Sequence, residues 1–118
     1  MIRVLWDVEE IVAFIDLYER TKRDGLDIDT ELHHFSDILI QRAKVLGIEH
    51  DDVYRNFNGM KMMYQNVEYI ASDGQHGLSG ASKAFVEVYQ MRNKCPYVFE
   101  MILHEFTRKY CSSLSKHC

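Results

Sequence analysis

The sequence lacks a hydrophobic run that could cross a membrane, because no apolar stretch approaches the roughly 18 residues that a spanning helix needs. Its N-terminus, MIRVLWDVEE, becomes acidic almost at once, which is not the pattern of a secretory signal peptide. We therefore predict a cytoplasmic protein that has no membrane partner.

Cysteine is scarce, with three residues at positions 95, 111 and 118. An odd number of cysteines without a secretory signal predicts reduced thiols rather than a disulfide framework. Four residues have side chains of the types that bind zinc: His104, Cys111, His117 and Cys118. Their spacing contains no C-x2-C pair, so we predict no metal site.

Motifs of catalysis are also absent, since the sequence contains no glycine-rich phosphate loop and no hydrolase nucleophile elbow. We predict that the chain is not an enzyme and needs no cofactor.

A basic excess is missing as well, because the formal net charge is −4. Nucleic-acid binders usually have a basic balance, so DNA binding here would require a local basic face on an acidic body.

What the sequence does contain is helical periodicity in a chain of 118 residues, a length that suits one domain. Apolar residues recur at helical spacing in five segments, which lie at about 7–23, 29–46, 59–70, 80–92 and 96–110. We predict an all-α fold, a compact domain over residues 1–111 with a frayed tail at 112–118. Residues 7–70 would form a trihelical core of helix-turn-helix type, followed by two C-terminal helices.

Four residues indicate where these helices begin and end. Asp7 and Glu10 have the spacing of a capping box at the start of the first helix. Gly47 suits the position that follows the second helix, and Pro96 suits the first turn of the fifth. For the third helix we predict Asn58 as the N-cap.

The third segment, YRNFNGMKMMYQNVEYI (54–70), divides into two faces at helical spacing. Its buried face is predicted to consist of four apolar residues: Met60, Met63, Val67 and Ile70. Its polar or aromatic residues remain available to a partner: Arg55, Asn56, Lys61, Tyr64 and Gln65. In proteins that read DNA with a helix, asparagine and glutamine recognise adenine and arginine recognises guanine. These five residues are therefore our candidate DNA-binding site.

The same residues also have a purely structural interpretation. Arg55 can pair with the acidic loop at 49–52, and Asn56 and Asn58 can form turns and caps. The sequence leaves both interpretations open.

The order of segments resembles two known patterns. A tryptophan before an acidic first helix, a second helix and an arginine-led third helix resemble the Myb/SANT-like trihelical plan, in which the third helix enters the major groove. The segments LWDVEEIVAFIDLYER (5–20), HHFSDILIQRAKVLG (33–47), YRNFNGMKMMYQNVEYI (54–70) and GLSGASKAFVEVY (77–89) resemble a helical domain at the front of bacterial restriction-type and phage-defence proteins. Arg55, Asn56, Gly59, Met62 and Asn66 match the pattern of its third segment. The resemblance implies a DNA- or partner-recognition module that accompanies a nuclease or other effector.

Two functions therefore stay in competition. The first is a non-catalytic DNA-recognition module that uses helix 59–70. The alternative is a protein-interaction or oligomerisation module, which is favoured by the acidic charge and by methionines at 60, 62, 63, 91 and 101 together with several tyrosines. A basic face built from arginines and lysines at 3, 20, 22, 23, 55 and 61 would favour DNA. An exposed patch of Met62, Tyr64 and Tyr69 would favour a protein.

Overall fold

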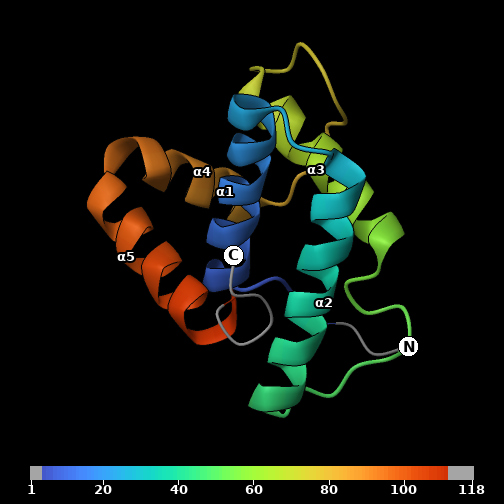
Figure 1. Ribbon diagram of the computed structural model, residues 1–118. Coiled ribbons are helices and arrows are strands. Elements are labelled where there is room, and N and C mark those ends of the chain that lie inside the picture. Colours follow the sequence, from blue (N-terminus) through green and yellow to red (C-terminus); the bar gives the residue numbers. More distant parts are fainter. Residues whose placement is uncertain (1–3, 112–118) are drawn as a thin grey trace.

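The computed structural model describes residues 4–111 and contains five α-helices followed by a π-helical turn (Figure 1). In chain order these elements are α1 (Val8–Asp24), α2 (Ile28–Leu46), α3 (Phe57–Ala71), α4 (Lys83–Lys94), α5 (Pro96–Phe106) and η1 (Thr107–Cys111). No strand occurs within residues 4–111, so the prediction of an all-α domain with five helices is confirmed.

Predicted signals at three helix ends are confirmed. The Asp7 side chain accepts a hydrogen bond from the backbone N–H of Glu10, while the Glu10 side chain accepts one from the backbone N–H of Asp7, which completes the capping box. Gly47 ends α2 in the left-handed region with φ of 71°. Pro96 occupies the first turn of α5, where its missing N–H costs no hydrogen bond.

Two helix starts differ from the prediction. Asn56, and not Asn58, is the N-cap of α3, because its side chain accepts a hydrogen bond of 2.9 Å from the backbone N–H of Gly59. Helix α4 begins at Lys83 rather than near Gly80. Its N-cap is Ser82, whose side chain accepts a hydrogen bond from the backbone N–H of Phe85. For α3 the sequence offers two cap candidates, Asn56 and Asn58, and the structure uses the first of them.

Helix α1 lies at the centre and contacts α2, α3, α4 and α5 (Figure 1). Its Phe14 packs edge-on against Trp6, Phe35 and Phe85, with ring centroids 5.6 to 6.3 Å apart. Phe85 from α4 and Phe106 from α5 are each 1% exposed and so are buried like Phe14. The two C-terminal helices therefore complete the same core as the first three.

Helices α4 and α5 form the left side of the molecule in Figure 1, whereas α3 lies on the other side of α1. The connector between α3 and α4 includes Gly77, whose φ of +86° lies in the region that glycine adopts readily. Within residues 4–111, no helix is long and apolar enough to cross a membrane. The predicted fraying of residues 112–118 lies outside the described residues.

Candidate functional site

Arg55 forms a buried ion pair with Glu10 of α1. Its Nε lies 2.8 Å from Glu10 Oε2 and its Nη2 lies 2.9 Å from Glu10 Oε1, so the contact is bidentate. The guanidinium also donates to the backbone carbonyls of Val4 and Leu5, each at 3.2 Å. Arg55 is 9% exposed and Glu10 is 1% exposed. The prediction that Arg55 is available to a partner is therefore wrong, and the carboxylate that it pairs with lies in α1 instead of the acidic loop.

Aromatic rings enclose the same guanidinium. The Arg55 Cζ lies 4.5 Å from the ring centroids of both Trp6 and Tyr54. A cation near an aromatic face is stabilised by the ring quadrupole, and more so where water is excluded. Burial raises the pKa of the Tyr54 hydroxyl, and the nearby Glu10 carboxylate acts in the same direction. These contacts fix the chain that enters α3 against the start of α1.

A second buried arginine supports the first turn of α1. Arg42 of α2 is 3% exposed, and its Nη2 lies 2.9 Å from Asp7 Oδ2 and 3.3 Å from Glu9 Oε1. Its Cζ also lies 5.3 Å from the Tyr110 ring centroid. Sequence analysis did not select Arg42, because nothing in its local pattern distinguishes it from an exposed helical arginine.

Tyr64 is the second candidate that the structure buries. It is 3% exposed, and its hydroxyl lies 2.5 Å from Thr21 Oγ1 of α1, while its ring lies 5.0 Å from that of Tyr18. The prediction that Tyr64 faces away from the core is wrong. Its position explains this, because Tyr64 is four residues after Met60 and three before Val67, on the same helical stripe.

Lys61 and Gln65 are the candidates that remain exposed, one turn apart on α3. The Lys61 Nζ lies 5.5 Å from the ring centroid of Phe57, which in turn stacks on the His33 ring at 3.8 Å. Asn56 is half-buried and its side-chain oxygen is engaged in capping. Of the five candidates, Lys61 and Gln65 are therefore the two whose side chains are exposed.

The basic face that would favour DNA is weakly developed on the described part of the chain. Arg20, Lys22 and Arg23 each have a carboxylate partner within 3.1 Å, at Asp16, Glu68 and Asp24. The loop before α3 adds exposed acidic residues at 49 and 52. Because phosphate contacts supply most of the affinity for DNA, paired cations beside carboxylates provide little of it.

A different surface, on α5, is apolar and exposed. Tyr97 is 86% exposed, Met101 is 69% exposed and Val98 is 45% exposed. Tyr97 and Met101 are four residues apart and so lie on one side of the helix, opposite the buried Phe99 and Phe106. Large apolar side chains that gather on one exposed helix face are a feature of protein-binding surfaces.

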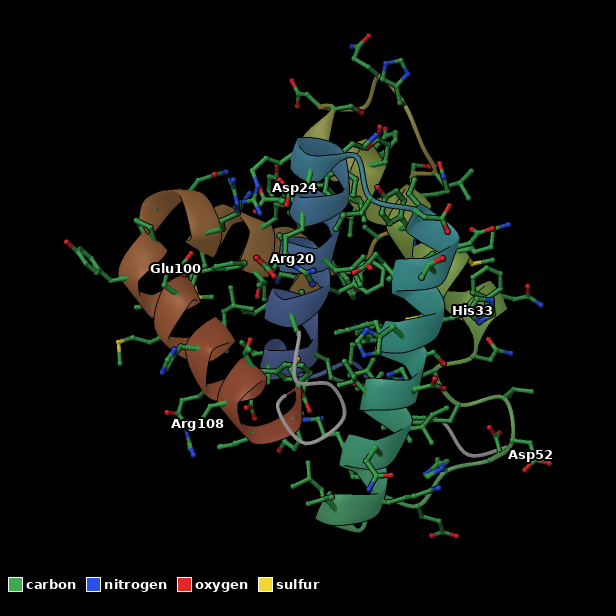
Figure 2. All side chains as sticks on the ribbon, in the orientation of Figure 1. Arg20, Asp24, His33, Asp52, Glu100 and Arg108 are labelled. Carbon is green, nitrogen blue, oxygen red and sulfur yellow. The ribbon has the colours of Figure 1, made fainter. Side chains whose placement is uncertain are left out.

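Between α1, α2 and α5 lies a partly open cavity of about 450 Å³. Its volume falls in the range of small-molecule pockets, about 300–1,000 Å³. Its lining includes Arg20, which Figure 2 labels on α1. Sequence analysis did not identify this cavity, since its walls come from segments as far apart in the sequence as Ala13 and Cys111.

Among residues 4–111, no group of three or more histidine, cysteine or acidic side chains is arranged to hold a metal ion. Of the four residues considered as zinc ligands from sequence, His117 and Cys118 lie outside the described residues. Comparison with protein-family models, curated proteins and solved structures yields no match for this chain.

Proposed function

We propose that the chain is a non-catalytic protein-interaction module that self-associates through the exposed face of α5. The observation that carries this proposal is the exposure of Tyr97, Val98 and Met101 on one helix face. Tyrosine and methionine are enriched in protein interfaces, because both supply a large contact area and methionine adapts to the partner's shape. The proposed setting is the cytoplasm, where the exposed thiol of Cys95 would stay reduced.

The partner that suits this surface is a second copy of the chain in a two-fold symmetric contact. In such a contact one apolar face packs against itself. If Tyr97 of one copy packs against Met101 of the other in antiparallel orientation, the C-terminal part of α5 in one copy lies beside the N-terminal end of α5 in the other. Glu105, which pairs with Arg108 in its own chain at 2.7 Å, then approaches the N-terminal end of the partner's α5, where the helix dipole attracts a carboxylate.

The contact should be weak. Helix α5 has 11 residues, which corresponds to a length of roughly 16 Å. A stable interface usually buries about 800 Å² on each partner, which is more than one short helix face provides. We therefore expect a dissociation constant of about 0.1 mM for the dimer.

Sedimentation velocity over protein concentrations from about 10 µM to about 1 mM tests this proposal. The wild-type chain should change from monomer to dimer across this range, and Met101→Lys should stay monomeric. Met62→Lys is the matched control, because Met62 is 61% exposed on α3, away from α5. A wild-type chain that is monomeric at all concentrations, or a dimer that Met62→Lys disrupts and Met101→Lys does not, would contradict the proposal.

DNA recognition by α3 is a second candidate, in line with the resemblance to restriction-type and phage-defence domains. The observation that favours it is that Lys61 and Gln65 are both exposed and one turn apart. Each could reach a duplex from the same helix face, with Lys61 on a phosphate and Gln65 on an adenine edge.

Titration of labelled duplex DNA at low salt tests this candidate. Lys61→Ala should weaken binding and reduce its salt dependence by about one counterion, because it removes one phosphate contact. Lys109→Ala is the control, since Lys109 is exposed on η1 at the other end of the chain. An absence of binding by the wild-type chain into the tens of micromolar range would exclude this function.

A further inference from the structure

We propose that the cavity between α1, α2 and α5 binds a small molecule that joins an apolar chain to a protonated amine. The inference is independent of self-association, because the cavity is lined by Leu103 and Phe106 on the inner side of α5, whereas Tyr97 and Met101 lie on its outer side. The two proposals can therefore fail separately.

The inner part of the cavity is apolar. Its walls include Leu17 from α1, Phe35 and Ile38 from α2, and Phe106 from α5. All four are at least 96% buried and form the close-packed floor of the cavity, so an entering group would mainly contact the less buried Leu26 and Leu103, which also line it. An apolar group that enters this space loses its contact with water, which is the main source of affinity for a small ligand.

The rim of the cavity supplies the polar part of the site. It contains Asp16, Arg20, Glu31 and His34. Arg20 bridges the two carboxylates, with Nε 2.8 Å from Asp16 Oδ2 and Nη1 3.5 Å from Glu31 Oε1. The longer contact to Glu31 is at the limit of a hydrogen bond, so the Glu31 carboxylate keeps capacity to accept from another donor.

Charge at the rim decides which head group fits. One guanidinium faces two carboxylates, so the formal charge of these three groups is −1. An incoming ammonium group is attracted by two charges and repelled by one, whereas an incoming carboxylate meets the opposite balance. A cationic head group is therefore favoured over an anionic one.

Three probes of equal chain length separate the contributions: n-hexylamine, 1-hexanol and hexanoate. Each is titrated into the full ¹⁵N-labelled chain at neutral pH and low salt, and amide shifts are followed by NMR. Hexylamine should bind with a dissociation constant of about 1–10 mM, as expected for so few non-hydrogen atoms. It should bind about threefold more tightly than hexanol, and hexanoate should bind most weakly.

Two variants locate the binding. Glu31→Gln should reduce the affinity for hexylamine about threefold and leave that for hexanol unchanged. Glu100→Gln is the matched control, because Glu100 is exposed on α5 (Figure 2) and does not line the cavity. Leu103→Trp should weaken all three probes by filling the space, with the helical content checked by circular dichroism.

Three results would overturn the proposal. The first is hexanoate binding as tightly as hexylamine in the wild-type chain. The second is a set of shifts that maps to residues away from the cavity. The third is no binding of any probe at about 50 mM, well above the expected dissociation constants. The comparison of probes on the wild-type chain is sufficient by itself, so the test does not depend on how Leu103→Trp folds.

Discussion

Replacement of Arg55 tests how much the buried ion pair between Arg55 and Glu10 contributes to the stability of the fold. Arg55→Ala would leave the Glu10 carboxylate, which is 1% exposed, without its bidentate partner. Removing one member of a buried ion pair typically costs about 3–5 kcal/mol, because the remaining charge stays buried and uncompensated. The backbone carbonyls of Val4 and Leu5 would also lose their donors. We expect a decrease in the free energy of unfolding of at least ~3 kcal/mol.

The backbone of Arg55 allows a second, independent measurement at the same position. Its φ of 47° lies in the left-handed region, which costs a non-glycine residue about 1 kcal/mol or more. Alanine keeps this strain, whereas glycine relieves it. Arg55→Gly should therefore be less destabilising than Arg55→Ala by about 1 kcal/mol, although both lose the ion pair.

Urea unfolding followed by circular dichroism measures these differences. Lys61→Ala is the control. Lys61 is exposed on α3, so its replacement should change the free energy of unfolding by less than about 0.5 kcal/mol. If Arg55→Ala unfolds like the wild type, the ion pair contributes nothing and Arg55 is free to serve a partner. If glycine is no better tolerated than alanine, the strained backbone at residue 55 is refuted.

Two further predictions concern the connector and a buried hydroxyl. Gly77→Ala should destabilise the chain by about 2 kcal/mol or more in the same unfolding assay, because its φ is +86° and a Cβ would lie 2.3 Å from the Gln65 carbonyl oxygen; Gly25→Ala, whose Cβ meets no neighbour within 4 Å, should cost only the strain of its φ. Tyr54→Phe should be neutral or stabilising, because the Tyr54 hydroxyl is buried without a hydrogen-bond partner in the described part of the chain. Since the folded pKa of Tyr54 is raised, its contribution is complete below the unfolded pKa of about 10 and is lost as pH rises above it. Unfolding from pH 8 to pH 11 should therefore show a steeper alkaline loss of stability for the wild type than for Tyr54→Phe, and equal slopes would contradict the raised pKa.

The helices could be predicted from sequence because their signals are local. The Asp7–Glu10 capping box, Gly47 and Pro96 act within three or four residues of the helix ends that they determine. The start of α3 was missed because Asn56 and Asn58 are equally good caps. The choice depends on Arg55, whose left-handed backbone precedes the helix and whose side chain is held by α1.

The candidate site was harder to predict because its decisive contacts are long-range. Arg55 and Glu10 are 45 residues apart, and Thr21 and Tyr64 are 43 apart. No local pattern encodes these pairs. Tyr64 was predicted to lie on the face available to a partner, although its spacing from Met60 and Val67 fits the apolar stripe. A hydroxyl can lie in a core when a partner such as Thr21 satisfies it.

Magnitudes also decide whether Arg55 could leave its pocket to contact DNA. Withdrawing the side chain would leave Glu10 buried and unpaired, at a cost of about 3–5 kcal/mol. A bidentate contact between an arginine and guanine contributes about 1–3 kcal/mol of discrimination. The exchange is therefore unfavourable, and the same charge that makes Arg55 suitable for DNA makes it necessary inside the fold. DNA recognition by α3 would have to depend on Lys61 and Gln65. Two side chains are a small set for an acidic domain, whereas the exposed face of α5 gathers Tyr97, Val98 and Met101 on one helix, which favours a protein partner over DNA.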